Sequence, residues 1–575
     1  MKQKIILIAS LGVIALLAVL VWYSPIIFKG YNVSILDVNA LVRARNLANA
    51  EINGAENDLN VVLSTDLLKE QGNQSLQGNN LSVFLMAKII KIFGSFNVLS
   101  VILFNCVVLA LALIIFGLAV YYLFGYKVFL FFSLIYIFLP SNWFITQSLL
   151  SYQFAVLFLA IFFLLFTLGT RGLGKEIKSN FFSLSTIYLI FSGIFLALAG
   201  LSKEAFLIFF PILFIFLLFS QNKKRLLYIF IPLTLILIIF WLPNFISGNN
   251  VYSFIFKTPS EVENSKAIDY SYYAEFFPDP YTYHFAQESY LQEQLSQGEN
   301  SDFTKQQAIN KQASSVGAMP LDFIGRLKIS SILTVRHLFR FMSISETGGP
   351  LITLLLIIGL IALKIKRKPW FILFTSWFLG SIILWGGVAL VGRNHMMDLG
   401  FGLAVCSSLG IILLTDSLSN QLSYQKNKNL ITFFILILVI YNLILSNHVM
   451  WSQKYNNNPI PLLDSYIEKI KENNIVSNDV IATPTSANEV YYLNYRSNKS
   501  FVVFQKETIE KLISENKLGQ VFDEFKVKYI LGYDPELSKK IVENYNIKNI
   551  ADNQIPINSF NVKLPNQSWF LNLIK

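Results

Sequence analysis

The sequence has few charged residues and almost no cysteine. Only 14% of its 575 residues are charged, whereas 54% are hydrophobic, and soluble domains carry about a quarter charged residues. The two cysteines, Cys106 and Cys406, fall in different apolar runs, so they provide neither a disulfide framework nor a zinc site. A soluble domain and a cysteine-rich secreted fold are therefore excluded for most of the chain.

Nucleotide-binding motifs are also missing. No G-x-x-x-x-G-K-[ST] segment occurs, no G-x-G-x-x-G opens a helix after a strand, and no D-x-D is found. Chemistry driven by ATP or by nucleotide sugars therefore has no support. The net charge of +11 would suit a nucleic acid, but the positive residues cluster in short loops between apolar runs, so we expect no nucleic-acid partner.

Long apolar runs are what the chain has in excess. A run of about 20 apolar residues spans a bilayer, and helices satisfy the backbone there, since the alternation of a β-barrel is absent. The sequence predicts an α-helical polytopic membrane protein with eleven spans near residues 5–24, 96–124, 127–139, 145–168, 181–201, 205–220, 226–243, 350–363, 369–391, 399–415 and 430–447. The short third span leaves three alternatives open, namely a tilt, a thinner bilayer, or a hairpin turning at Pro140.

Basic residues predict the orientation of these spans. Residues 1–20 resemble a signal peptide, but no small-x-small cleavage site follows, so we interpret this run as an uncleaved first helix. If the N-terminus is cytoplasmic, the inner connections hold fifteen basic and two acidic residues, as the positive-inside rule requires. We therefore expect a multi-pass cell-membrane protein with its N-terminus in the cytoplasm and its C-terminal region outside.

The topology predicts two domains. Residues 1–447 form the transmembrane domain, with outer loops 25–95 and 244–349, and the first loop ends in an amphipathic interfacial helix over 81–94. Residues 448–575 are polar and predict a small extracytoplasmic α/β domain. In that region the strand-like stretches DVIATP, SFVVF and KYILGY alternate with the helical stretches SANEVYYLNY, KETIEKLISEN and PELSKKIVENY.

Ionisable residues gather at the outer ends of the predicted spans, where charge near the membrane is costly and often functional. The first cluster follows the first span in SILDVNALVRARN and contains Asp37, Arg43 and Arg45. The Asp37 carboxylate is a candidate general base for an acceptor hydroxyl, or a cation ligand. Alternatively, it caps the helix that follows it.

Two tight outer turns provide the other clusters. In LAGLSKEAFLIFFP, Lys203 and Glu204 separate two apolar runs, and the ammonium is a candidate phosphate ligand or a lysine that reaches for the membrane surface beside a local ion pair. In VGRNHMMDLGFG, the planar guanidinium of Arg393 suits a phosphate. His395 in the same turn could orient a substrate, bind a metal, or make a simple polar contact.

This layout resembles the membrane glycosyltransferases of the GT-C fold. The resemblance rests on LDVNALVRARN after the first span, on the LSKEA turn, on the GRNHMMDLG turn and on the outer soluble tail. The similar groups are bacterial relatives of the protein O-mannosyltransferases and the aminoarabinose transferases of lipid A. Val38 stands where many members have a second acid, so dependence on a divalent metal stays open.

The resemblance implies a hexosyl or pentosyl transferase of the cell envelope. Its donor would be a sugar on polyprenyl phosphate, its acceptor an extracytoplasmic glycan, lipid or protein, and membrane lipids would surround it. Asp37 would be the catalytic residue that activates the acceptor as a base, and Lys203 and Arg393 would bind the donor phosphate. A single displacement with inversion is implied. Weaker candidates near the site are Arg43, Arg45, Glu204 and His395.

Two alternatives remain at this stage. A surface-polysaccharide polymerase or ligase would use the same kind of donor, but it would depend on basic residues of the loop 244–349. A non-enzymatic transporter of lipid-linked glycans would need polar residues along a path through the spans, and the span centres are nearly free of charge. Loss of activity on Asp37→Asn with normal membrane insertion would favour the glycosyltransferase.

Overall fold

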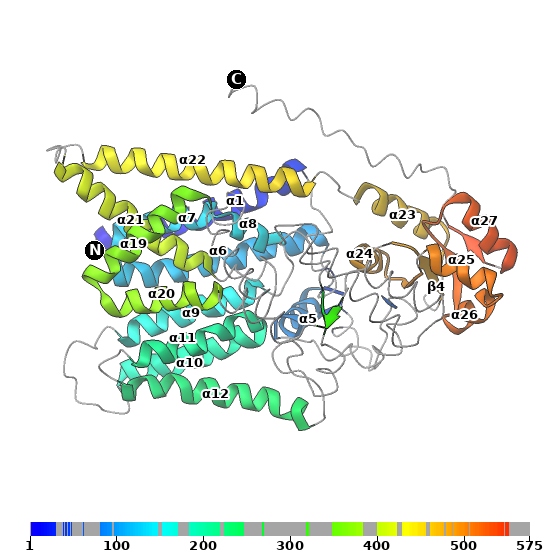
Figure 1. Cartoon of the computed structure of the whole chain (residues 1–575), viewed down its shortest axis with the longest axis horizontal. Helices are drawn as coiled ribbons and strands as arrows, with labels where there is room; N and C mark the ends of the chain where they lie inside the picture. The colour runs from blue at the N-terminus through cyan, green and yellow to red at the C-terminus, as the bar shows by residue number, and fades with distance from the viewer. Residues whose placement is uncertain are drawn as a thin grey trace, which may run out of the picture.

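The structure is a computed structural model in which a bundle of long helices bears a small α/β domain at one end (Figure 1). It describes residues 2–29, 38, 41–42, 44–45, 48, 61–62, 81–94, 97–147, 152–170, 183–218, 223–246, 267–269, 318–320, 348–382, 399–421, 428–455, 460–475, 479–485, 487–504, 506–545 and 547–550.

The predicted spans are helices wherever the structure describes them. Six helices are long and apolar enough to cross a membrane, namely α1 (Lys2–Lys29), α6 (Val98–Phe124), α9 (Tyr152–Thr170), α10 (Leu184–Ser202), α21 (Gly400–Gln421) and α22 (Lys428–Tyr455). Shorter or less uniform helices are α7 (Tyr126–Phe138), α8 (Pro140–Gln147), η2 (Glu204–Ile208), α11 (Phe209–Leu218), α12 (Lys223–Ile246), α19 (Pro350–Lys366) and α20 (Lys368–Ile382). The prediction of an α-helical polytopic membrane protein is confirmed.

Helix α7 has only 13 residues and packs in the bundle beside longer helices. It runs alongside α1 in the same direction, because the hydroxyls of Ser10 and Tyr126 share a hydrogen bond of 2.8 Å and Trp22 Nε1 donates to the Ile137 carbonyl at 2.8 Å. Helix α1 continues to Lys29, about 10 Å beyond the level of Trp22 at 1.5 Å per residue. Helix α7 therefore ends well before its neighbour does.

The last carbonyls of α7 are satisfied by side chains from other helices. Asn142 Nδ2 of α8 donates to the Tyr136 carbonyl at 2.5 Å, and Asn447 Nδ2 of α22 donates to the Phe138 carbonyl at 2.7 Å. Carbonyls at a helix end have no partner within the helix, and in lipid an unpaired one is expensive. These donors allow α7 to end inside the bundle.

The chain does not turn back at Pro140, which was one of the predicted alternatives. Only Leu139 separates α7 from α8, and α9 begins at Tyr152. The span predicted over residues 145–168 is thus divided between the end of α8 and most of α9. A proline in the first turn of a helix is well tolerated because its missing N–H has no helical partner there.

Glycines bring α19 and α21 into close contact. A side-chain carbon on Gly359 would overlap the backbone of Cys406, and one on Gly410 would overlap the backbone of Leu355. Helices in lipid associate through close packing, since the hydrophobic effect does not drive them together. Small residues at these two positions let the two backbones approach.

Aromatic rings fill the centre of the bundle. Phe116 of α6 stacks on Phe401 of α21 with ring centroids 4.0 Å apart. Trp377 of α20 contacts Phe163 of α9 at 5.6 Å and Phe209 of α11 at 4.5 Å. Five helices are therefore joined through one aromatic cluster, in which each ring pair contributes about 0.5–1.5 kcal/mol beyond its buried area.

The tail forms the predicted α/β domain around a parallel sheet. Its strands β4 (Val480–Thr483), β5 (Ser500–Val503), β6 (Val527–Ile530) and β7 (Lys548–Asn549) stand beside β1 (Val61–Val62) in the order β1-β5-β4-β6-β7. The helices are α23 (Ile460–Glu472), α24 (Ala487–Ser497), α25 (Lys506–Ser514), α26 (Leu518–Glu524) and α27 (Pro535–Asn544). All six stretches expected from the tail sequence have the predicted type.

Strand β1 was not predicted, and it comes from the first outer loop. Val61 and Val62 pair in parallel with Phe501 and Val502 of β5. In the other long loop, β2 (Ala267–Asp269) and β3 (Ala318–Pro320) form an antiparallel pair. The loop that follows α1 therefore contributes an edge strand to the tail domain.

The amphipathic segment at 81–94 is helix α5 (Leu81–Phe93), as expected. Its buried residues are Ser82, Val83, Met86, Ala87 and Ile90, and it packs against α9 and α10. Ile92 and Phe93 at its end are 72% exposed. An apolar end that leaves the protein is what an interfacial helix would place in lipid, and that location stays a prediction.

Candidate functional site

Lys203 occupies the end of α10 at the side of the bundle that bears the tail. The residue leaves the helix in an extended conformation, and η2 begins directly after it. Its Nζ lies 5.1 Å from the centroid of the Tyr152 ring at the start of α9. A cation over a ring face gains about 0.5–2 kcal/mol, so the ring fixes the ammonium without neutralising it. None of the described carboxylates forms an ion pair with it.

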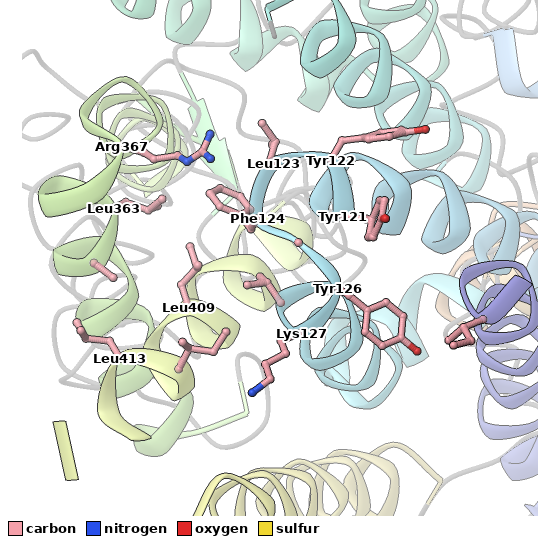
Figure 2. A pocket seen from close by; sticks show the side chains of 15 residues that line it. Tyr121, Tyr122, Leu123, Phe124, Tyr126, Lys127, Leu363, Arg367, Leu409 and Leu413 are labelled. Atoms are coloured by element: carbon pink, nitrogen blue, oxygen red, sulfur yellow. The ribbon is translucent and has the colours of Figure 1, made fainter. Parts of the chain in front are cut away.

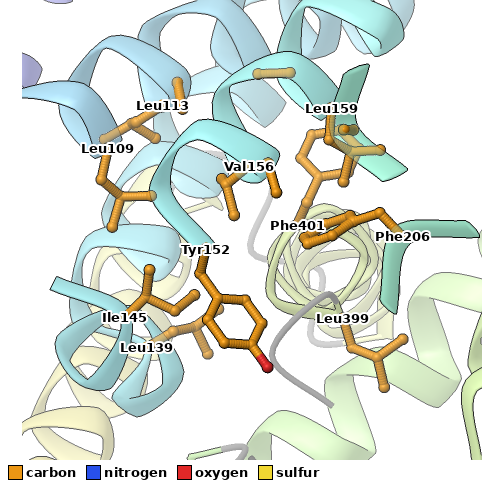
Figure 3. Close-up of a cluster of buried hydrophobic side chains, with 14 of the residues drawn as sticks. Leu109, Leu113, Leu139, Ile145, Tyr152, Val156, Leu159, Phe206, Leu399 and Phe401 are labelled. Carbon is orange, nitrogen blue, oxygen red and sulfur yellow. The ribbon is translucent and has the colours of Figure 1, made fainter. Parts of the chain in front are cut away.

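Several helix ends meet near the Tyr152 ring that this lysine contacts. Figure 3 shows Tyr152 beside Leu139 and Ile145, with its hydroxyl on the side of Leu399, the residue before α21. The Ser82 hydroxyl of α5 donates to the carbonyl of the residue before Lys203 at 3.3 Å. The first turn of α9, the last turns of α8 and α10, and the first turns of α5 and α21 thus gather in one place.

Buried polar groups in this place lack partners within the described part of the chain. They are the hydroxyls of Ser141 and Ser202 and the Asn142 side-chain carbonyl. A side-chain carbon on Gly400 would lie 3.3 Å from Ser141 Oγ and 3.4 Å from Asn142 Oδ1, so α21 starts against α8 here. An unpaired buried polar group costs about 1–3 kcal/mol, which favours a further polar ligand at this point.

Arg45 has a different environment, between the first outer loop and the tail. It is 5% exposed, its Nη1 donates to the carbonyls of Asn494 and Tyr495 at 3.1 and 3.2 Å, and its Nη2 donates to Asn494 Oδ1 at 2.8 Å. Burial lowers the pKa of the Arg45 guanidinium and raises the pKa of the Tyr495 phenol to about 12. Arg45 thus connects the loop to helix α24.

The segment around Arg45 is helical at each described position, and one of its faces is buried. Its described residues are Val38, Leu41, Val42, Ala44, Arg45 and Ala48, all at most 5% exposed. Spacings of three and four residues place side chains on one helical face. Asp37 immediately precedes this segment in the sequence.

The other predicted site residues are placed less fully. Asp37, Arg43, Arg393 and His395 lie outside the described residues. Glu204 opens η2, but its side chain is not described. The structure therefore positions two of the predicted residues, Lys203 and Arg45, and their side chains have separate partners.

The sequence did not indicate Tyr152 and Asn494 as partners of these cations, nor Ser82 as the partner of the Ser202 carbonyl. Tyr152 opens an apolar span, Ser82 begins the amphipathic helix, and Asn494 lies within a helix of the tail. Each is more than 50 positions away in sequence from the residue that it contacts. A polar residue at the first turn of a span was the one signal available for Tyr152 and Ser82.

Within the described residues no group of three His, Cys, Asp or Glu side chains could hold a metal ion. Asp37, Glu204 and His395 do not enter this statement, because their side chains lie outside the described part.

Neither a protein-family model nor a curated protein matches the sequence. Among solved structures, the Archaeoglobus fulgidus oligosaccharyltransferase in complex with zinc and sulfate is 14% identical, with a TM-score of 0.50 over 90% of this chain and 67% of that one. The same enzyme tethered to an acceptor peptide gives 0.50, at 14% identity, over 92% and 69%. ArnT from Cupriavidus metallidurans gives 0.46, at 10% identity, over 92% and 89%. The helical bundle with its α/β tail has the GT-C fold of membrane glycosyltransferases, as the sequence resemblance predicted.

Proposed function

We propose that this protein transfers a sugar from a polyprenyl-phosphate carrier to a glycan, lipid or protein acceptor outside the cytoplasm. The observation that carries the proposal is Lys203, a cation at the tail-side ends of five helices with a ring contact but no acid partner among the described residues. Such a cation can bind a phosphate as a point charge. The donor lipid would reach it by lateral diffusion in the membrane.

The proposed reaction needs one carboxylate, which acts as a base, and two cations. The acceptor hydroxyl attacks the anomeric carbon, and its proton passes to the Asp37 carboxylate. The bond from that carbon to the phosphate oxygen breaks, and the phosphate leaves with the electron pair. Lys203 and Arg393 stabilise the negative charge that develops on the leaving group. No step runs through a metal ion.

The described residues that neighbour Arg393 and Asp37 in the sequence support a location of both residues near Lys203. Leu399 follows the Arg393 turn by six residues and lies in the cluster that contains Tyr152 (Figure 3). Asp37 precedes a buried helical segment that Arg45 ties to the tail. A catalytic acid on that segment would be set in position by the tail domain.

The same proposal includes orientation and domain organisation. The fifteen basic residues of the predicted inner connections favour a cytoplasmic N-terminus, so the tail and Lys203 face outside. The chain then consists of a membrane domain over 1–447 and a soluble domain over 448–575. The first loop contributes strand β1 to the sheet of the soluble domain.

A binding measurement tests the donor. The full-length protein in detergent is titrated with undecaprenyl phosphate and, as a matched ligand, with the corresponding alcohol, and the melting temperature is followed. We expect the phosphate to stabilise the wild type and the alcohol to do little. Lys203→Ala should weaken phosphate binding about tenfold or more, whereas Lys203→Arg should keep most of it.

Lys88→Ala is the matched control, because Lys88 Nζ also lies over a ring, 5.0 Å from Phe84 on α5. It should bind undecaprenyl phosphate as the wild type does. Equal affinity of wild type and Lys203→Ala for the phosphate would contradict the proposed role of Lys203.

A further inference from the structure

A cavity lies at the end of the bundle opposite the tail. It has a volume of about 1080 Å³ and is formed by the turn between α6 and α7, the end of α19, one face of α21 and the start of α1 (Figure 2). Small-molecule sites typically enclose about 300–1,000 Å³. The size therefore suits an amphiphile of substantial length.

Two cations and no acid are among the described residues that line this cavity. Lys127 comes from the first turn of α7 and Arg367 from the end of α19, and Figure 2 shows them on different walls with Phe124 and Leu409 between. Arg367 lies 5.7 Å from the centroid of the Phe124 ring. Neither cation has an ion pair with a described carboxylate. Opposite-charge ligands are favoured where cations are left uncompensated.

The nearest acid on α21 is already engaged. Asp416 follows the lining residue Leu413 by one turn and pairs with Lys428 at the start of α22. Asp416 therefore does not pair with Lys127 or Arg367, so the positive potential of the cavity is not cancelled from this helix.

The start of α7 adds to the attraction for an anion. Gly125 caps this 13-residue helix without a side-chain hydrogen bond, and its own N–H donates to the Tyr121 carbonyl at 2.9 Å. The first-turn N–H groups after it face no capping oxygen, and the N-terminal end of a helix carries a partial positive charge. Gly125, Tyr126 and Lys127 all line the cavity.

The remaining lining is apolar and reaches the surface that faces lipid. Leu123, Leu363 and Leu413 are part of it. Ile6 of α1 closes one side and is 52% exposed, as is its neighbour Ile5 at 56%. An apolar wall that continues to an exposed apolar helix favours a lipid over a soluble anion.

We infer that this cavity binds an anionic phospholipid, with the phosphate between Lys127 and Arg367 and the acyl chain along the leucine-lined wall toward Ile6. The site is separate from the proposed donor site, and its existence does not depend on the proposed function. A bound lipid would fasten α7, α19 and α21 together at this end. Anionic lipid binding by basic pockets between membrane helices follows from the same electrostatics.

The test uses the full-length protein in detergent, with phosphatidylglycerol, phosphatidylcholine and soluble glycerol phosphate as probes. Bound lipid is counted by native mass spectrometry, and the melting temperature is recorded in parallel. We expect the wild type to retain phosphatidylglycerol at least tenfold more strongly than phosphatidylcholine. Lys127→Gln with Arg367→Gln should lose that preference, and Lys127→Arg should keep it.

The matched control is Lys364→Gln with Lys368→Gln, which removes the same charge from the same end without altering the cavity lining. It should retain phosphatidylglycerol as the wild type does. Equal loss in the control would show general attraction to basic loops, and equal retention by the Lys127→Gln/Arg367→Gln protein would show binding elsewhere. Glycerol phosphate that binds as tightly as the lipid would show a soluble anion as ligand. Each of these three results would overturn the inference.

Discussion

The two ends of the helix bundle use positive charge differently. At the tail side, Arg45 is buried in hydrogen bonds to α24 and Lys203 is fixed over the Tyr152 ring. At the opposite end, Lys364 and Lys368 are exposed cations among many. Charges that set membrane orientation act as a sum, so single members can be exchanged. A charge that binds one ligand or one helix acts individually. The contacts of its side chain distinguish it from charges that act only as a sum.

The largest effect that would sharpen this contrast is expected at Asp37. Asp37→Asn removes the proposed base while keeping the side-chain shape, and transfer should fall by about 10²–10⁴-fold. Binding of undecaprenyl phosphate should stay unchanged, since the phosphate contacts are elsewhere. Sugar transfer to the acceptor in membranes gives the rate, and the melting-temperature titration gives the affinity. Asp464→Asn, at a tail carboxylate that accepts from Tyr492 at 2.9 Å, is the control and should transfer normally.

A smaller but large loss is expected at Lys203. Lys203→Ala should lower transfer by about 10–100-fold, because a charge-assisted contact to the phosphate is worth about 1.5–3 kcal/mol. Lys364→Gln with Lys368→Gln removes two charges from the other end and should leave transfer near the wild-type rate. Similar losses in both proteins would erase the distinction between the two ends.

Arg45 should matter for the junction rather than for the chemistry. Arg45→Met removes the hydrogen bonds that the guanidinium donates to Asn494 and to the Tyr495 carbonyl, and we expect about 2–3 kcal/mol to be lost from the contact between loop and tail. Hydrogen exchange of residues 487–503 in the full-length protein should quicken accordingly. Arg496→Met is a matched change on the same helix, at a half-exposed pair 3.7 Å from Asp464, and should alter exchange by less than about 1 kcal/mol. Unchanged exchange in Arg45→Met would contradict the role of Arg45 at the junction.

The smallest effect concerns the pH response of the tail. Asp534 begins α27, accepts from the Leu537 N–H at 2.9 Å and pairs with Lys506 at 2.7 Å. These contacts, with the Lys506 hydrogen bond the largest, hold the pKa of Asp534 below its usual value. The stability that it contributes is therefore present above the unfolded pKa and is lost as the pH falls through the lower folded pKa.

Two variants separate the cap from the charge. Asp534→Ala should lower the stability of α27 by about 1 kcal/mol at neutral pH. Asp534→Asn keeps an accepting oxygen, so it should cost only a few tenths of a kcal/mol and should remove this part of the acid sensitivity. Hydrogen exchange of the α27 amides, followed as a function of pH, measures both the stability of the helix and its acid sensitivity. An Asp534→Asn protein with the acid profile of the wild type would exclude Asp534 as its source.

The membrane helices and the tail elements could be read from the sequence because both follow local patterns. Apolar runs indicate spans, and strand-like stretches such as SFVVF and KYILGY alternate with amphipathic ones. A hairpin at Pro140 was one of three alternatives for the short third span, and in the structure Pro140 opens α8, since a proline opens a helix as readily as it ends one. Strand β1 was missed because two valines in a polar loop carry no pattern, and their partner Phe501 is hundreds of residues away.

The candidate site was predictable only in part. Lys203 could be chosen because a lysine in a tight turn between apolar spans is unusual. Its partner Tyr152 and the burial of Arg45 depend on tertiary packing between distant segments. For the same reason, the sequence could not separate Lys127 and Arg367 from the other basic residues at their end of the bundle.

The central claim is that the tail-side end binds a polyprenyl phosphate through Lys203 and Arg393. Mass spectrometry of lipids that co-purify with the wild type and with the Lys203→Ala/Arg393→Ala protein tests it most directly. We expect a polyprenyl phosphate, or its sugar conjugate, to be enriched on the wild type and lost from the double variant, while phosphatidylglycerol is retained by both. No such lipid on the wild type, or equal amounts on both proteins, would contradict the claim.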